Sequence, residues 1–135
     1  MSDSFHILKV SSSKRIEVRD ITAGVAKLVA SRGINDGVCY VYVPHTTAAV
    51  TINENADPDV KTDLIKGIEA IVPEDLGYDH DEGNSPAHIK TTLVGNSTTI
   101  FVDGGRLVLG TWQGIYFCEF DGPRERKVYV KVIEG

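Results

Sequence analysis

The run from Val38 to Val43 constrains the fold of this chain most. It reads VCYVYV, so a strand built from it would be apolar on both faces. Such a strand belongs at the centre of a sheet, where other parts of the protein cover both of its faces. Pro44 ends the run, because proline lacks the N–H that a strand ladder needs. The chain is therefore expected to be built around a sheet.

Short alternating stretches between turn residues predict further strands. They are Phe5 to Val10, Arg15 to Arg19, Thr47 to Ile52, Thr98 to Val102, a long run from Arg106 to Phe120, and Lys127 to Ile133. Asp103-Gly104-Gly105 and Asp121-Gly122-Pro123 supply tight turns between the last of these. Gly110 and Gly114 interrupt the long run, which indicates a bulge or the close approach of another group.

Two helices are predicted by their caps and apolar spacing. Asp20 can cap the first helix, and Gly33 suits its end. Asp57 followed by Pro58 is a strong start for the second, because aspartate caps free N–H groups and proline is tolerated at the first helical position. The apolar face of the second helix is expected to hold Val60, Leu64, Ile68 and Ile71.

A third helix is predicted to open at Ser85-Pro86, with Ile89 and Leu93 as its buried pair. Before it, residues 73–85 form an acidic loop with little apolar content. Three short helices among about eight strands indicate an α+β fold built on antiparallel sheet. With 135 residues and no linker that would divide it, the chain is expected to form a single domain.

The charge balance and the cysteines limit the functions to consider. The formal net charge is −5, which disfavours general binding to nucleic acid. No apolar stretch approaches the roughly 20 residues of a membrane helix, and the N-terminus does not have the pattern of a secretory signal. Cys39 and Cys118 lie in apolar runs without a CxxC partner. They are expected to be reduced and buried, as in a cytoplasmic protein.

Polar side chains gather in PHTTAAVTINENADPD, residues 44–59. His45 directly follows the apolar strand, at the edge where a sheet meets solvent, and an imidazole there can transfer protons or bind a metal. Glu54, Asn55 and Asp57 come at the far end of the next strand, and carboxylates can hold Mg²⁺. For Asp57 alone we favour the simpler explanation, which is that it only caps a helix.

A second polar segment, DHDEGNSPAHIK, spans residues 79–90. On the third helix His88 lies about 100° from Ile89, off the expected apolar stripe, so it need not be a core residue. It falls in the first turn, where the helix dipole disfavours an imidazolium and leaves a neutral ring that binds metals or accepts protons. Free N–H groups at this helix end suit a phosphate. The alternative is a solvated acidic loop with a surface histidine.

Three histidines, His45, His80 and His88, could make a metal site with an open position, although no pair has the i, i+4 spacing of a helical zinc motif. Another candidate is the segment GTWQG, residues 110–114, because glycines in a strand cost stability unless another group comes close. Trp112 there either stacks on the heteroaromatic ring of a ligand, with the Gln113 amide as a hydrogen-bonding group, or lies in the core. We expect the core for its ring.

Two further sets of residues have simpler explanations. His6 is expected only to pack or to lie at the surface of an N-terminal strand. Arg124, Arg126 and Lys127 are able to meet anionic oxygens, but a solvated charged turn is their expected role.

Taken together, these segments resemble the YjbQ-like family, whose members are described as secondary thiamine-phosphate synthase enzymes. The matching runs stand in the family's order and spacing and span nearly the whole chain; they are PHTTAAVTINENADPDV, YDHDEGNSPAHIK, GRLVLGTWQGIYFCEFDGPR and VYVKVI. The resemblance implies an antiparallel β-sandwich-like α+β domain over residues 1–135 that forms a homotrimer. It also implies that the histidines form a metal or anion site near a subunit interface.

The activity implied by the resemblance joins an aminopyrimidine methyl diphosphate to a thiazole phosphate, giving thiamine phosphate and diphosphate, either as the main activity or as a side activity of an enzyme with another main substrate. The catalytic candidates are His45 and His88 for proton transfer, and Glu54 and Glu82 for contact with the pyrimidine amino group. A divalent metal, Mg²⁺ or Zn²⁺, on His45, His80 and His88 would stabilise the leaving diphosphate. The substrate-binding candidates are Thr46, Thr47, Asn55, Asp57, Asn84, Ser85, Thr111, Trp112 and Gln113.

Two other hypotheses use the same residues. One is a metal-dependent hydrolase of a small metabolite. The other is a non-catalytic trimer that binds a metal or a small anionic ligand. The enzyme hypotheses predict turnover that is lost with His88, whereas the binding hypothesis predicts affinity for a ligand without any product.

Overall fold

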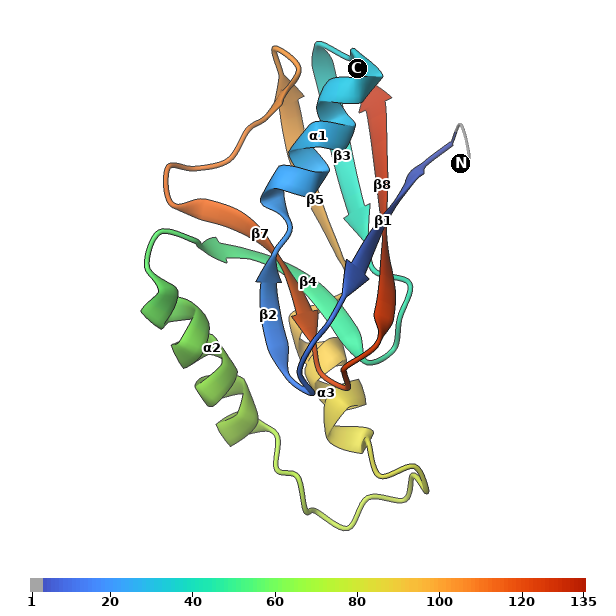
Figure 1. Ribbon diagram of the computed structural model, residues 1–135, viewed down its shortest axis with the longest axis vertical. Helices are drawn as coiled ribbons and strands as arrows, with labels where there is room; N and C mark the ends of the chain where they lie inside the picture. Colours follow the sequence, from blue (N-terminus) through green and yellow to red (C-terminus); the bar gives the residue numbers. More distant parts are fainter. Residues whose placement is uncertain (1–3) are drawn as a thin grey trace.

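The computed structural model describes residues 4–135, which form eight strands and three helices (Figure 1). The strands are β1 (His6–Ser11), β2 (Glu17–Asp20), β3 (Asp36–Tyr42), β4 (Ala48–Glu54), β5 (Ser97–Asp103), β6 (Arg106–Leu107), β7 (Gln113–Glu119) and β8 (Glu125–Glu134). The helices are α1 (Thr22–Arg32), α2 (Pro58–Ile71) and α3 (Ser85–Val94).

The strands form two antiparallel sheets. The larger has the order β1-β8-β3-β5-β6 and the smaller has the order β2-β7-β4. In Figure 1, α1 lies over the larger sheet, while α2 and α3 lie by the smaller one. The predicted α+β class, with antiparallel sheet and three short helices, is confirmed. The main core lies between the sheets and α1, and it includes the fully buried side chains of Val25, Val41 and Phe117.

The strand that most constrained the fold, β3, is central but covered on only one face. It pairs with β5 on one side and with β8 on the other. Cys39 and Val41 are fully buried, whereas Tyr40 and Tyr42 are 43% and 45% exposed. The prediction that both faces are covered is therefore wrong within a single chain. The aromatic side chains instead form part of an exposed sheet surface, where Tyr42 stands 6.3 Å from Tyr129 between ring centroids.

The second helix begins as its capping residue predicts, whereas the N-cap position of α1 is Ile21 and not the predicted Asp20, which lies one residue earlier. Asp20 accepts a hydrogen bond from the N–H of Thr22 at 2.9 Å, and α1 ends at Gly33 in the left-handed conformation that glycine favours. Asp57 accepts from the N–H of Asp59 at 2.9 Å and so caps α2. Although Leu64, Ile65 and Ile68 of α2 face the smaller sheet, no side chain of this helix is fully buried.

The inner face of α3 differs from the prediction. Ile89 and Leu93, the expected buried pair, are 37% and 56% exposed. The helix itself begins at Ser85, with Asn84 at the N-cap position. The buried residues are instead Pro86, Ala87, Lys90 and Thr91. Lys90 makes this possible, because its aliphatic stem packs inside while its ammonium pairs with a carboxylate. Because lysine is normally exposed, the apolar pattern of α3 predicted the wrong inner face for this helix.

The expected long strand from Arg106 to Phe120 is divided. β6 ends at Leu107, and a loop leads from it to β7. The close approach predicted at Gly114 is confirmed, since a Cβ there would come within 2.6 Å of the Asn55 amide nitrogen. The prediction of a core position for Trp112 is wrong: the side chain is 62% exposed, because the chain has left the sheet at that point.

Cys39 and Cys118 are buried and unpaired, as predicted. Burial raises the pKa of the Cys39 thiol to about 11 and that of Cys118 to about 12, so both are protonated at neutral pH. His6 packs within β1 and is 8% exposed. Along residues 4–135, no helix is both long and apolar enough to cross a bilayer.

Two glycine substitutions test the close packing of β3. A Cβ on Gly37 would lie 2.2 Å from the carbonyl oxygen of Ile133, whereas one on Gly67 of α2 would meet nothing within 4 Å. We expect Gly37→Ala to lower the free energy of unfolding by about 1–3 kcal/mol. Gly67→Ala should raise it by about 0.5–1 kcal/mol, because alanine favours the helix. Urea unfolding measures both, and equal effects would contradict this packing.

Candidate functional site

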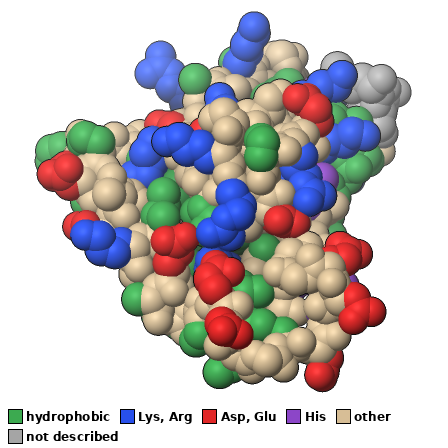
Figure 2. All heavy atoms as spheres, turned by 60° about the horizontal axis from the view of Figure 1, so that its bottom comes forward, with side chains coloured by type: hydrophobic (Ala, Val, Ile, Leu, Met, Phe, Trp, Pro, Cys, Tyr) green, Lys and Arg blue, Asp and Glu red, His purple; other side chains and the backbone are tan. Residues whose placement is uncertain are grey.

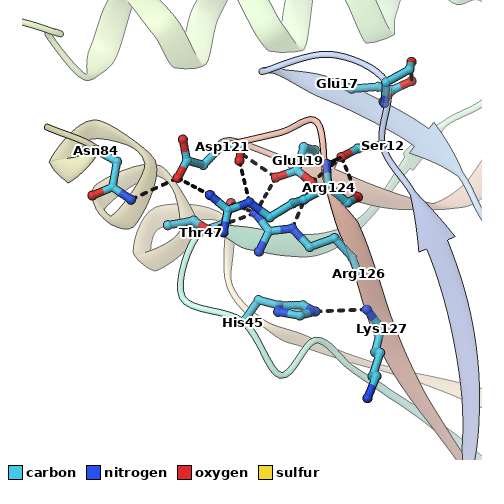
Figure 3. Close-up of polar contacts among 11 residues, drawn as sticks. Ser12, Glu17, His45, Thr47, Asn84, Glu119, Asp121, Arg124, Arg126 and Lys127 are labelled. Carbon is cyan, nitrogen blue, oxygen red and sulfur yellow. Dashed lines mark hydrogen bonds and ion pairs between the residues drawn. The ribbon is translucent and has the colours of Figure 1, made fainter. Parts of the chain in front are cut away.

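A buried ion pair joins the two sheets where β7 leads into β8. Glu119 is fully buried and Arg126 is 4% exposed. Arg126 Nε donates to Glu119 Oε1 at 2.9 Å, and a terminal nitrogen of the guanidinium donates to Oε2 (Figure 3). The planar guanidinium fork suits this two-pronged contact. Arg124 and Lys127 are exposed as predicted, but the prediction of a solvated turn is wrong for Arg126.

The carboxylate of Glu119 accepts four hydrogen bonds. Besides the two from Arg126, the Ser12 hydroxyl donates at 2.6 Å and the N–H of Asp121 donates at 3.0 Å. Burial alone would raise the pKa of Glu119, but the bonds from Arg126, Ser12 and Asp121 outweigh it and leave that pKa below its usual value. Arg126 also donates to the Thr47 hydroxyl at 2.9 Å, so the pair fixes the chain at the start of β4.

His45 lies beside this ion pair, in the loop between β3 and β4. Its Nε2 accepts a hydrogen bond from the backbone N–H of Lys127 at 3.0 Å, so the neutral ring carries its hydrogen on Nδ1 (Figure 3). Burial lowers the pKa of His45, and the charges of Arg126 and Arg124 lower it further, while Glu119 opposes them. The imidazole is therefore neutral at pH 7.

Two adjoining hollows share His45, Thr46 and Asn96 in their walls, and we call them together the polar groove. The arginine hollow, of about 520 Å³, is lined by Tyr42, Pro44, His45, Thr46, Thr47, Asn96, Arg124 and Arg126. The histidine hollow, of about 440 Å³, is lined by His45, Thr46, His88, Thr91, Thr92, Gly95 and Asn96. The structure thus brings together His45, Thr46, Thr47 and His88 from the predicted site.

Thr91 is a residue of the polar groove that sequence reasoning missed. Its side chain is 7% exposed, and its hydroxyl has no hydrogen-bond partner among the described residues. A buried polar group is costly in this state unless a ligand or water meets it. Thr91 lies three residues after His88, on the same face of α3. That helical spacing is the signal that would have identified it.

A third hollow, of about 390 Å³, adjoins the groove through His88. It is lined by Tyr78, Asp79, His80, Ser85, His88 and Ile89. The rings of His80 and His88 meet edge to face with 5.4 Å between centroids, and the exposed Glu82 carboxylate lies 4.0 Å from His80. Asn84 ties this part of the chain to the groove, because its side-chain amide donates to Asp121 at 2.9 Å.

The other predicted site residues lie at the opposite end of β4. This strand has seven residues, which puts about 20 Å between Glu54 and the His45 end. Asn55 also lies there, and its N–H donates to the carbonyl of Trp112 at 2.8 Å, which brings the neighbours Thr111 and Gln113 to the same end. Asp57 is engaged in capping α2. Within one chain, this second group does not reach the polar groove.

A family model described as "UPF0047 protein YjbQ-like" matches residues 6–135. The chain belongs to the UPF0047 family. Its relatives in this family include UPF0047 protein MJ1081 of Methanocaldococcus jannaschii, which is 50% identical over 93% of this chain and 91% of the relative. UPF0047 protein YugU of Bacillus subtilis is also 50% identical, over 93% of this chain and 96% of the relative.

Solved structures of UPF0047 relatives share the whole fold. A YjbQ/UPF0047 family protein of Clostridium acetobutylicum is 51% identical, with a TM-score of 0.92 over 95% of this chain and 99% of that one. A Sulfolobus solfataricus protein described as of unknown function is 34% identical, with a TM-score of 0.93 over 97% of this chain and 96% of that one. The family is therefore certain, while these names assign it no activity.

In this UPF0047 chain, the three histidines do not fit one shared metal ion. Over residues 4–135, no three His, Cys, Asp or Glu side chains come close enough together to hold a metal. The Nε2 lone pair of His45 is already taken by Lys127, and its other ring nitrogen carries the hydrogen. A metal on His45 would have to displace that backbone hydrogen bond. His80 and His88 are near each other, but they supply only two imidazoles.

The buried ion pair predicts a specific loss of stability. Glu119→Gln leaves Arg126 buried without a counter-charge, and we expect the free energy of unfolding to fall by about 3–5 kcal/mol. The matched control, Glu134→Gln, alters an exposed carboxylate and should change it by less than about 0.5 kcal/mol. Denaturant unfolding measures both. A loss below about 1 kcal/mol for Glu119→Gln would contradict the structural role of the pair.

The same pair predicts how stability depends on pH. Because the folded pKa of Glu119 is depressed, its contribution is complete well above the usual value of 4.5. It is lost as the pH falls from that value through the lower folded pKa. Unfolding measured from pH 6 downward should therefore show a loss of stability in the wild type that is smaller in Glu119→Gln.

Proposed function

We propose that the polar groove is the active site of an enzyme that transfers groups between small phosphorylated heterocycles. The observation that carries this proposal is His45, a neutral imidazole held in the wall that the arginine and histidine hollows share. A neutral imidazole with its N–H on Nδ1 can give a hydrogen bond to an anionic oxygen, and it takes up a proton on Nε2 only when it releases the backbone N–H of Lys127.

The two ends of the groove suit different parts of such a substrate. Arg124 lies at one end with its side chain 51% exposed, and its guanidinium can form charge-assisted bonds to phosphate oxygens. Asp121 already pairs with Arg124 at 2.9 Å, so a phosphate would have to compete for it. At the other end, Thr91 offers an unpaired hydroxyl beside His88. These contacts favour a ligand with an anionic group and a separate polar group.

The specific reaction we propose is the joining of an aminopyrimidine methyl diphosphate to a thiazole phosphate, as the family resemblance implies, whether as the main or as a secondary activity. His45 and His88 are the proton-transfer candidates. Mg²⁺ or Zn²⁺ stays a prediction, and no step is assigned to it because the histidines do not fit one shared ion. We place the reaction in the cytoplasm, which the two unpaired buried thiols support.

We also propose that the chain forms a homotrimer through the outer face of the larger sheet. The apolar residues of this face that are more than 40% exposed are Ile7, Tyr40, Tyr42, Phe101 and Ile133. They lie on β1, β3, β5 and β8, so they form a neighbouring set on one sheet. Contiguous exposed apolar surface of this kind marks protein interfaces. Tyr42 also lines the arginine hollow, so the interface would border the polar groove.

Activity should depend on His45 and His88 but not on the fold alone. With the two substrates and Mg²⁺ supplied, we expect His45→Gln and His88→Gln each to lower the rate of thiamine phosphate formation by about 10²–10⁴-fold, with circular dichroism unchanged. Product is measured by chromatography. Trace rates that survive both substitutions would rule out the transferase, while affinity without any product would favour a binding protein. Hydrolysed substrate without a joined product would favour a hydrolase.

The pH dependence of the reaction rate and the variant His80→Gln distinguish acid–base chemistry from metal chemistry. Because the pKa of His45 is lowered from 6.5, a requirement for its neutral form predicts an acid limb of the pH–rate profile below pH 6.5. His80→Gln should leave the rate within a fewfold of wild type if no metal is held there. A large loss in His80→Gln that excess Mg²⁺ or Zn²⁺ restores would instead support the predicted metal site.

The trimer can be tested with two equally exposed residues. Phe101 on the sheet face is 68% exposed, and Leu76 in the acidic loop is 67% exposed. We expect Phe101→Lys to convert the trimer into monomers, because it places a charge in an apolar contact, while Leu76→Lys leaves the trimer intact. Light scattering after gel filtration measures the mass of each. A monomeric wild-type protein would end the proposal.

A further inference from the structure

A cavity of about 260 Å³ lies between α2, α3 and the smaller sheet. Leu64, Ile65 and Ile68 of α2 form one wall, and Val18 and Cys118 of the sheet form another. None of its lining residues belongs to the polar groove. The space exists because α2 rests on the sheet without burying any side chain fully. Cavities with apolar walls take apolar molecules in preference to water.

Lys90 interrupts this apolar lining with a buried charge. Its side chain is 1% exposed and forms part of the cavity wall. Among the described residues its ammonium has one partner, the carboxylate of Glu74 at 3.3 Å. An ammonium carries three N–H donors, so two of them lack an acceptor. Unmet donors away from water are costly, and Lys90 is a lining residue of the cavity, so an acceptor of a ligand that reaches the ammonium from the cavity would satisfy one of them.

The charges around Lys90 decide what kind of acceptor fits. Glu74 also pairs with Arg15 at 3.6 Å, and Arg15 lies 3.8 Å from Glu69, another residue of the cavity wall. The positive charges of Arg15 and Lys90 are therefore already balanced by the two carboxylates, Glu69 and Glu74. A ligand carboxylate would add a third negative charge beside Glu69 and Glu74, whereas a neutral carbonyl oxygen would accept from Lys90 without disturbing the balance.

The surface around this cavity carries charges of both signs (Figure 2). Figure 2, which brings the end with the acidic loop forward, shows both acidic and basic side chains with apolar ones exposed among them. Leu93, which lines the cavity, is 56% exposed, so the cavity has an apolar edge that is open to solvent.

We propose that this cavity binds an uncharged apolar molecule of about one aromatic ring that carries a single carbonyl oxygen, and that Lys90 donates to that oxygen. The site is separate from the polar groove, and it does not depend on the transferase activity. Its volume lies just below the roughly 300–1,000 Å³ of pockets that take drug-sized ligands, which limits the occupant to a small molecule.

Three molecules of nearly equal shape test the proposal: acetophenone, ethylbenzene and benzoate. Each is titrated into the full chain, and amide chemical shifts around Cys118 and Val94 report binding. We expect acetophenone to bind about tenfold more tightly than ethylbenzene, because one hydrogen bond to a charged donor has about this effect. Benzoate should bind more weakly than acetophenone. Equal affinities for ethylbenzene and acetophenone, tightest binding by benzoate, or no binding at all would overturn the proposal.

Two substitutions with matched controls isolate the role of Lys90. Lys90→Met should reduce acetophenone binding to the level of ethylbenzene, while Lys66→Met, on the exposed face of α2, changes neither. Glu74→Gln removes one carboxylate, so we expect benzoate to gain about tenfold relative to acetophenone, with Glu134→Gln as the neutral control. Glu74 is 53% exposed, so this variant can decide the question even if Lys90→Met fails to fold. An unchanged benzoate-to-acetophenone ratio in Glu74→Gln would overturn the charge-balance account.

Discussion

The geometry of the groove depends on the buried pair between Glu119 and Arg126. Removing two charges from water costs several kcal/mol each, and the mutual attraction repays this only when every remaining donor and acceptor is matched. Here Ser12 and the N–H of Asp121 donate the remaining hydrogen bonds to the Glu119 carboxylate, and the Thr47 hydroxyl accepts one from Arg126. Because the pair and its partners come from four separate parts of the chain, at Ser12, Thr47, residues 119–121 and Arg126, the pair fixes how the two sheets meet.

His45 gains its properties from that junction. The direction of β8 that turns Arg126 inward also presents the N–H of Lys127 to the imidazole, which sets the tautomer of the ring. The nearby guanidinium charges and partial burial then keep the ring neutral. The same features that stabilise the fold at this point therefore prepare one of the two histidines on which the proposed chemistry depends.

The groove and the cavity under α2 share an electrostatic principle. In both places cations and carboxylates are paired before any ligand arrives, as Arg124 is with Asp121 and Lys90 is with Glu74. At both proposed sites, a ligand would then be recognised by the hydrogen bonds that these pairs leave unfilled and by its shape, rather than by a strong field. The two sites differ in the residues that line them, which are mostly polar in the groove and mostly apolar under α2.

The sequence by itself determined the class of fold, the positions of most strands and the start of α2, because these follow from local alternation and from capping at Asp57. It also determined the family and placed His45 and His88 among the site candidates. Only the tertiary structure decided that Arg126 is buried, that Trp112 is exposed and that α3 turns Lys90 inward. These outcomes depend on partners distant in the chain, such as Glu119 for Arg126, and local periodicity contains no information about them.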